Sequence, residues 1–158
     1  MIDATESPIE KPKKSKGITN SGKRKRHTFK IQLIVDKKSR RVISTSFCKG
    51  KGHDFRLYKE SNTPIHPKTK VITDTGYQGL QKLHANTVMP IKRKKNQNLS
   101  REEKRQNRAI SSQRVEDENV IGLLKRFKII SDRYRNRRKR FGLRFNLIAG
   151  IYNWEISN

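Results

Sequence analysis

The 158-residue sequence has one cysteine, Cys48, and only 14 acidic residues against 39 lysines and arginines. A single cysteine excludes an internal disulfide and any zinc site built from several thiolates, and the four histidines show no zinc-like spacing. The sequence also lacks a signal peptide, an apolar run that could cross a bilayer, and an amphipathic helix with a broad aromatic face. These absences favour a cytoplasmic protein with no membrane partner.

The remaining composition is dominated by positive charge. The formal net charge is +25, and the sequence pI is about 10.8. Such a field makes compaction costly unless a polyanion is present, so nucleic acid is the expected partner, with an affinity that falls steeply as salt rises. Hydrophobic residues make up 31 % of the chain. They are clustered, and the length suits one domain with a modest core.

Alternating apolar residues predict a β-hairpin in the first third of the chain. Between residues 27 and 35 every second side chain is apolar, the pattern of a half-buried strand. A turn at residues 36–39 precedes a second alternating run at 42–47, so the two runs are expected to pair antiparallel. The faces expected to be apolar carry Phe29, Ile31, Leu33 and Val35 on the first strand, and Ile43, Thr45 and Phe47 on the second.

The other apolar segments predict a mixture of helices and strands. Ser100 and Glu103 fit a capping box that starts a long helix running to about Ile130. A terminal helix is expected to cover the core with Leu143, Leu147, Ile148, Ile151 and Tyr152, which recur at helical spacing. The remaining expected elements are a strand stub at residues 2–3, helices at 53–60 and 77–84, and strands at 71–72 and 87–91. Together they predict an α/β fold in which the hairpin and the strand at 71–72 share one mixed sheet.

Asp74 closes the short apolar run Val71-Ile72 and precedes the turn residues Thr75-Gly76. Ligand-binding side chains collect at the carboxyl ends of strands in α/β sheets, so a carboxylate in this place is a candidate ligand. Aspartate before Thr-Gly is also ordinary turn chemistry, and this stretch alone favours that simpler role.

Three charged residues of the long helix share one narrow stripe. At about 100° per residue, Arg114, Glu118 and Lys125 lie within about 40° of one another. Surface ion pairs between neighbouring turns could by themselves explain this stripe. A separate apolar stripe, able to hold the helix against the sheet, consists of Val120, Leu124 and Phe127.

Basic segments are expected to contact DNA phosphates rather than bases. The first is a loop at residues 11–26, for which a solvated linker is the alternative. The last is the basic run from Arg133 to Arg144, which opens the segment 133–158 that also contains the terminal helix. The candidate DNA-binding side chains are Lys23, Arg24, Lys25, Arg26, Lys92, Arg93, Lys94, Arg135, Arg137, Arg138, Lys139 and Arg140.

Several motifs stand in a fixed order over nearly the whole chain. They are I-D-A-T-E-S-P-I, S-G-K-R-K-R-H-T-F-K, G-H-D-F, V-I-T-D-T-G-Y-Q-G, the R-x3-E-x6-K pattern from Arg114 to Lys125, and K-R-F-K-I-I-S-D-R-Y-R-N-R-R-K-R-F-G-L-R-F-N-L-I-A-G-I-Y-N. Each motif is weak alone, but together they closely resemble the catalytic part of bacterial insertion-sequence transposases. These are the DDE endonucleases, and the likeness is greatest to insertion sequence family five.

This resemblance implies a ribonuclease-H-like fold and a site of three acids. They are Asp3 in the first strand, Asp74 after the fourth, and Glu118 in the long helix. Such a site would hold two Mg²⁺ or Mn²⁺ ions, which take oxygen ligands and promote in-line phosphodiester displacement. Arg114 and Lys125 would stabilise charge on the phosphodiester. Related families carry a tyrosine three residues before this arginine, and here Ser111 takes its place.

The resemblance also implies partners: the ends of an insertion sequence, its target DNA in the bacterial nucleoid, an upstream-frame helix-turn-helix part, and an oligomer on DNA. Because only two residues precede Asp3, we expect the first strand to be truncated and the chain to be a downstream-frame or truncated product of marginal stability. Two alternatives stay open. One is a non-catalytic basic DNA-binding fragment, and the other is an inactive transposase remnant.

Overall fold

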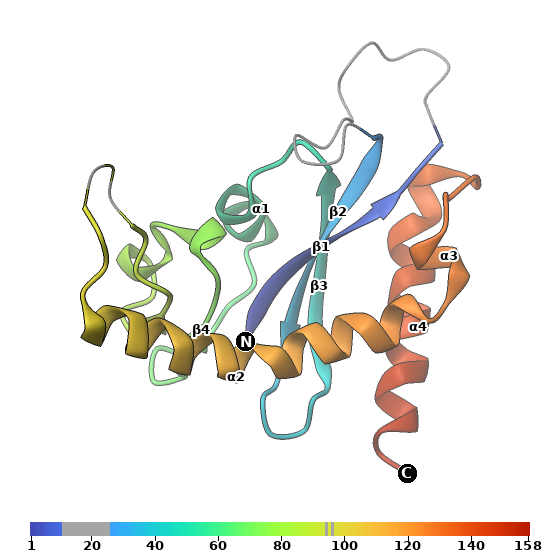
Figure 1. Cartoon of the computed structure of the whole chain (residues 1–158). Coiled ribbons are helices and arrows are strands. Elements are labelled where there is room, and N and C mark those ends of the chain that lie inside the picture. The colour runs from blue at the N-terminus through green and yellow to red at the C-terminus, as the bar shows by residue number, and fades with distance from the viewer. Residues whose placement is uncertain (11–25, 94, 96) are drawn as a thin grey trace.

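The computed structural model describes residues 1–10, 26–93, 95 and 97–158, except for the side chains of residues 116 and 117. A three-stranded antiparallel sheet, ordered β1-β2-β3, occupies its centre and consists of Ile2–Pro8, Thr28–Val35 and Val42–Lys49. Figure 1 shows the long helix α2 (Arg101–Lys125) crossing this sheet and α4 (Phe141–Glu155) lying along one side of it. The mixed α/β class is confirmed. Among the described residues no helix is long and apolar enough to span a membrane.

The expected hairpin is present as β2 and β3, with one difference in side-chain placement. Thr45 lies opposite Leu33 and Phe47 opposite Ile31, as the alternation predicts. A register shift between Ile34 and Val35 then places Val42 opposite Val35. Val42 is therefore buried in the core, whereas the expected core residue Ile43 is 65 % exposed. A one-residue shift moves a side chain to the other face of a sheet, and alternation alone cannot locate it.

Strand β2 is buried on both faces rather than half-buried. Ile31 and Leu33 face one core cluster, and Ile34 faces a second one. Gln32 and Thr28, which the polar half of the alternation would place in solvent, are each 1 % exposed. The strand lies in the middle of the sheet, and further elements cover its second face.

The first strand is longer than the stub expected at residues 2–3. Strand β1 has seven residues and pairs with β2 along its whole length, from Ile2 opposite Ile34 to Pro8 opposite Thr28. The expectation of a strand that lacks most of its ladder hydrogen bonds is wrong, because most of β1 follows Asp3 instead of preceding it. The marginal stability expected from a truncated strand therefore has no support in the pairing of β1.

The strands β4 (Val71–Ile72) and β5 (Thr87–Val88) form a separate two-stranded parallel sheet. One mixed sheet was expected, but β4 meets β1 only through side chains, in a cluster that includes Ile2, Val71 and Tyr77. Strand β5 is shorter than predicted because Pro90 has no N–H to give to a ladder. Instead of a strand partner, the Ile91 N–H donates to the side chain of Asn107 at 2.8 Å.

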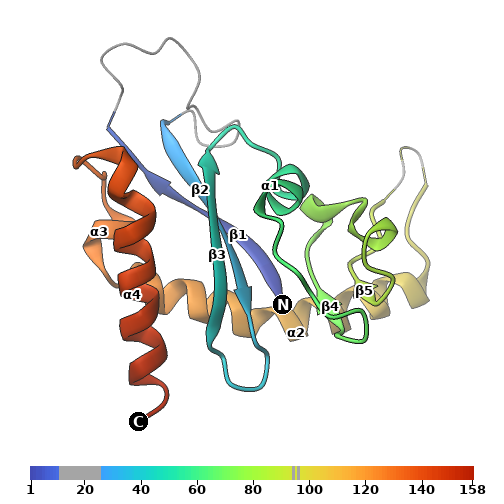
Figure 2. The ribbon, with the colours of Figure 1, turned by 180° about the vertical axis from the view of Figure 1, so that it is seen from behind.

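Helix α1 (Asp54–Ser61) matches the expected helix and lies next to β3 (Figure 2). The helix expected at residues 77–84 is replaced by two 3₁₀ turns, η1 (Thr75–Tyr77) and η2 (Leu80–Lys82). Gly79 separates them with a φ of 101°, a left-handed backbone that an α-helix cannot contain.

Helix α2 (Arg101–Lys125) begins with the predicted capping box of Ser100 and Glu103. Its apolar stripe packs on the sheet as predicted: Val120 and Leu124 are each 1 % exposed, and Phe127 packs against the same cluster. The helix ends earlier than expected. Phe127 has an extended backbone, and a short helix α3 (Lys128–Ser131) follows it. No glycine or proline marks this break in the sequence.

Helix α4 (Phe141–Glu155) covers the core, but not with the whole predicted face. Ile148 and Tyr152 are buried, whereas Leu143, Leu147 and Ile151 are exposed. The buried side also carries aromatic residues that pack against rings of β2 and β3; these are Phe141 and Phe145, in contact with Phe29 and Phe47. Helix α4 is apolar nearly all round, so spacing alone does not select its buried face.

Candidate active site

Asp3 is the most enclosed of the predicted acids. It is the second residue of β1, and its side chain is 14 % exposed. Its Oδ1 accepts a hydrogen bond from the backbone N–H of Ala4 at 2.8 Å. Arg114 Nη2, from α2, lies 3.7 Å from the same oxygen. Two predicted site residues from distant parts of the sequence therefore form one ion pair.

The environment of Asp3 raises its pKa to about 6 from the ordinary 3.8. Burial is the largest cause, because it disfavours the ionised form. The Ala4 hydrogen bond and the Arg114 charge lower the pKa, while the charges of Asp74 and Glu118 raise it further. The three predicted acids are thus close enough to repel one another, which is the electrostatic condition that a bound cation relieves.

Asp74 lies directly after β4 and caps η1. Its Oδ1 accepts a hydrogen bond from the Gly76 N–H at 2.8 Å. The simple turn role that the local sequence favours is therefore real. This turn also holds the half-buried carboxylate at the carboxyl end of a strand, so the turn role and a ligand role are compatible.

A further carboxylate, Asp54 of α1, lies behind this turn and was given no role by sequence reasoning. A Cβ atom added to Gly76 would stand 2.4 Å from Asp54 Oδ2 and 2.9 Å from Asp74 Oδ1. Asp54 Oδ1 forms an ion pair of 2.7 Å with Lys30 Nζ, which also donates to the Gly52 carbonyl at 2.6 Å. The G-H-D-F motif was the only sequence signal for this arrangement.

Tyr77 closes the inner side of the same region. It is fully buried, and among the described residues its hydroxyl has no hydrogen-bond partner. Burial raises the pKa of this phenol, and the charges of Asp54, Asp3 and Asp74 raise it further. The hydroxyl therefore stays protonated and lies near three carboxylates.

Glu118 and Lys125 occupy different surroundings, although both belong to the charged stripe of α2. Glu118 is exposed and acts on Asp3 through its charge. Lys125 lines a cavity of about 160 Å³ together with Arg26 and Ser131, at the Pro8 end of β1. A rise of 1.5 Å per residue puts its Cα about 16 Å from that of Arg114. The structure thus brings Arg114 to Asp3 and Lys125 to the far end of the strand.

The donor set suits hard divalent cations, since all three predicted ligands are carboxylates. The raised pKa of Asp3, caused in part by Asp74 and Glu118, also fits a cation-binding site. No group of three potential ligands is gathered at metal-binding distance among the residues that the structure describes. The three acids are therefore close enough to interact through their charges, but the described side chains do not form a metal-ligand shell.

The basic candidates fall into three places. Arg26 lines the cavity that also holds Lys125. The exposed Lys92 and Arg93 follow β5, and the connection between α3 and α4 carries a third exposed group, Arg135, Arg137, Arg138, Lys139 and Arg140. Lys23, Arg24, Lys25 and Lys94 lie outside the described residues.

Comparisons with known proteins identify a family and a relative for the chain. The family described as DDE superfamily endonuclease matches residues 2–153. A curated relative from Microchaete diplosiphon, named "Probable transposase for insertion sequence element IS702", is 48 % identical over 157 residues. The match covers 99 % of this chain and 57 % of the relative, so the chain spans little more than half of that protein's length. No solved structure gives a significant match.

Proposed function

The chain belongs to the DDE superfamily of endonucleases, and from this membership we propose that it is the catalytic part of a DNA transposase. In this proposal it cleaves a phosphodiester at the end of an insertion sequence and joins the freed strand to target DNA. We also propose that its sheet and helices form a ribonuclease-H-like catalytic core. The observation that carries the proposal is the enclosed Asp3, whose ionisation is opposed by Asp74 and Glu118 from two other elements.

In the proposed mechanism Asp3, Asp74 and Glu118 would hold the divalent cations. When bound, these ions supply an activated oxygen nucleophile and stabilise the leaving oxygen. Arg114 holds Asp3 in place through the 3.7 Å contact. Its Nε is buried and has no hydrogen-bond partner among the described residues. The η1 turn fixes the orientation of Asp74 through the Gly76 N–H.

Nicking of supercoiled plasmid tests this function. We expect conversion to the nicked circle with Mg²⁺ or Mn²⁺ and none with EDTA. Asp74→Asn keeps the size of the side chain and its bond to Gly76 but removes its charge, so it should abolish nicking. Glu60→Gln, at an exposed carboxylate of α1, is the control and should nick like the unchanged chain.

A basic fragment that binds DNA without cleaving it is the competing function, and the net charge of +25 favours it. It predicts salt-sensitive DNA binding with no metal-dependent nicking under any condition. The same assay, together with a binding measurement on the same sample, separates the two functions.

A further inference from the structure

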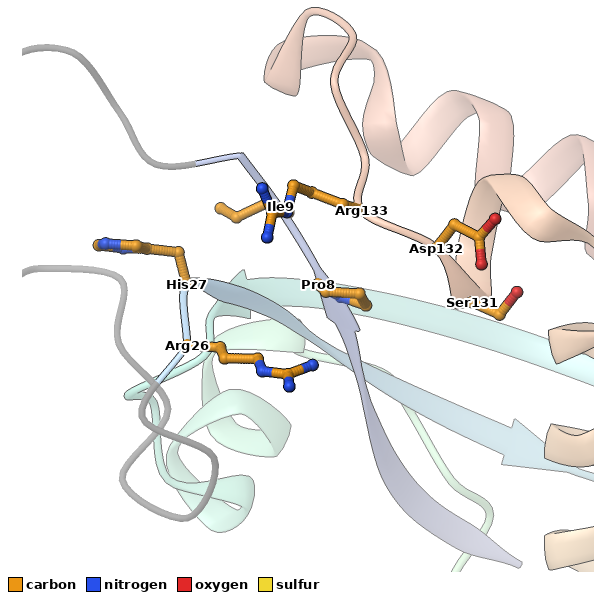
Figure 3. A pocket seen from close by; sticks show the side chains of 7 residues that line it. All are labelled: Pro8, Ile9, Arg26, His27, Ser131, Asp132 and Arg133. Atoms are coloured by element: carbon orange, nitrogen blue, oxygen red, sulfur yellow. The ribbon is translucent and has the colours of Figure 1, made fainter.

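A basic cavity of about 460 Å³ lies at the end of β1 that is remote from Asp3. Figure 3 shows Arg26 and Arg133 on either side of the strand end at Pro8 and Ile9. Arg26 comes from the segment before β2, and Arg133 from the segment after α3. Residues far apart in the sequence therefore place two guanidinium groups beside one cavity.

Backbone hydrogen bonds fix the walls of this cavity. The Ile9 N–H donates to the His27 carbonyl at 2.8 Å, and the Tyr134 N–H donates to the Pro8 carbonyl at 2.9 Å. The Glu10 N–H donates in turn to the Tyr134 carbonyl at 3.1 Å. Tyr134 is itself buried in the main core cluster. The backbone that carries the two arginines is therefore set before any ligand arrives, which lowers the entropy cost of binding.

The charge of the cavity suits an anion. Neither Arg26 nor Arg133 makes an ion pair with any residue that the structure describes. Among the described residues that line the cavity Asp132 is the single acid, and His27 also contributes to the lining. Guanidinium groups match the geometry of phosphate oxygens and bind them through two parallel hydrogen bonds. A phosphate group is the chemistry that this lining recognises best.

The smaller cavity that holds Lys125 adjoins the basic cavity. Both are lined by Pro8, Arg26 and Ser131. The smaller cavity is also lined by Glu6, and its Lys125 comes from α2, the helix that also carries Arg114.

Two independent lengths give the distance between this cavity and the acids. Along β1, five residues separate Asp3 from Pro8, which at 3.3 Å per residue is about 16 Å. Along α2, eleven residues separate Arg114 from Lys125, which at 1.5 Å per residue is also about 16 Å. One strand of a DNA duplex advances 3.4 Å per nucleotide, so 16 Å corresponds to about five nucleotides.

We propose that Arg26, Arg133 and Lys125 bind a backbone phosphate of the DNA about five nucleotides from the one at Asp3. This cavity is a positioning site: it fixes the register of the duplex, while the acids act on a different phosphate. The inference rests on the proposed function in one respect, namely that DNA is the ligand. Its tests use binding and cross-linking, so neither depends on cleavage.

The first test compares two double variants that remove the same charge. Arg26→Gln with Arg133→Gln removes the two guanidinium groups, whereas Lys37→Gln with Lys38→Gln removes two exposed charges from the β2–β3 turn, at the other end of the sheet. Binding of a 20-base-pair duplex is measured by fluorescence anisotropy in EDTA from 50 to 200 mM salt. All three proteins should melt within about 2 °C of one another, since the replaced side chains are exposed.

We expect the arginine variant to lose at least tenfold in affinity at 100 mM salt. The slope of log K against log salt should become shallower by about 0.9 for each phosphate that the variant no longer neutralises. The lysine variant should lose less than threefold. Equal reductions of affinity in the two variants would show only general electrostatic attraction and would overturn the proposal.

The second test measures the five-nucleotide spacing. The DNA carries one tether that ends in an activated disulfide. The cysteine of Asp3→Cys, in a Cys48→Ser background, exchanges with this disulfide, releases the leaving thiol and becomes linked to the DNA. A single methylphosphonate, which removes the charge of one phosphate, is then moved from two to eight nucleotides away on either strand. The cross-linking rate should fall at least fivefold when the neutral phosphate lies four to six nucleotides away. This minimum in the rate should disappear in the Arg26→Gln, Arg133→Gln background.

Slowing that is independent of position, or a minimum that persists without the two arginines, would contradict the positioning role. Failure of Asp3→Cys to cross-link at any tether position would mean that DNA does not reach Asp3. That outcome would refute the proposed function and the spacing together. The binding comparison would still test independently whether the cavity binds DNA.

Discussion

Replacing Asp3 by asparagine should make the metal-free protein more stable at neutral pH. The side chain is 14 % exposed, and its pKa is raised from 3.8 to about 6. At 1.36 kcal/mol for each pH unit, the ionised form costs the folded state about 3 kcal/mol. That is a large share of the 5–15 kcal/mol that stabilises a typical domain.

The sign of the pH dependence follows from proton binding. Between pH 3.8 and about 6 the folded chain holds the Asp3 proton more tightly than the unfolded chain does. Stability from this group is therefore complete below pH 3.8 and is lost as the pH rises through about 6. Asparagine has no charge to lose, so the variant should lack this part of the pH dependence.

The assay is urea unfolding followed by circular dichroism in EDTA at pH 4.0, 5.0, 6.0 and 7.5. The free energy of unfolding of Asp3→Asn minus that of the unchanged chain should grow by about 2–3 kcal/mol from pH 4.0 to 7.5. Asp132→Asn is the matched control for the loss of one negative charge. If the difference in free energy of unfolding between Asp3→Asn and the unchanged chain stays constant across this pH range, the burial of Asp3 and its raised pKa are refuted.

Two further predictions concern packing, and each is measured as a free energy of unfolding. Gly76→Ala should lose about 1–3 kcal/mol, because its Cβ would stand 2.4 Å from Asp54 Oδ2. Its control, Gly122→Ala on α2, meets no atom within 4 Å and should gain about 0.5–1 kcal/mol; equal effects at the two glycines would contradict this. Leu124→Ala should cost about 2–5 kcal/mol, since the side chain is 1 % exposed. Leu123→Ala, at a residue 45 % exposed, should cost under about 1 kcal/mol, and a comparable loss would place α2 differently on the sheet.

Where local physics decides the structure, the sequence was sufficient to predict it. The capping box at Ser100 depends only on residues within one helical turn, and it forms as expected. The β2–β3 hairpin depends on alternation and a nearby turn. The two stripes of α2 predicted which side packs on the core, and Arg114 from this helix does reach Asp3.

Where the outcome depends on distant packing, sequence reasoning failed. The bulge that exposes Ile43 occurs where α4 reaches the end of the hairpin, and Asn153 there both donates to and accepts from the Val42 backbone at 2.8 Å. No residue near Val42 signals a partner 111 positions away. The break of α2 before α3 likewise follows from burying Ile130 in the core, not from a helix-breaking residue.

The site shows the same division. The family resemblance implied Asp3, Asp74 and Glu118 as site residues, but it could not show that Lys125 lines a cavity with Arg26 at the other end of β1. Nor could it show that Asp54 packs against Gly76 behind Asp74. Both facts depend on how α1 and α2 lie across the sheet, which only the folded chain defines.

The central claim is that Asp3, Asp74 and Glu118 act as one cation site for DNA cleavage. The most direct measurement is the rate of Mn²⁺-dependent plasmid nicking by Asp3→Asn, Asp74→Asn, Glu118→Gln and the triple variant. Residues that act as a unit lose activity non-additively. Each single variant should therefore lose at least 100-fold, and the triple variant should be no slower than the slowest single one. Losses that multiply from one variant to the next, or a single variant that nicks at the unchanged rate, would contradict the claim.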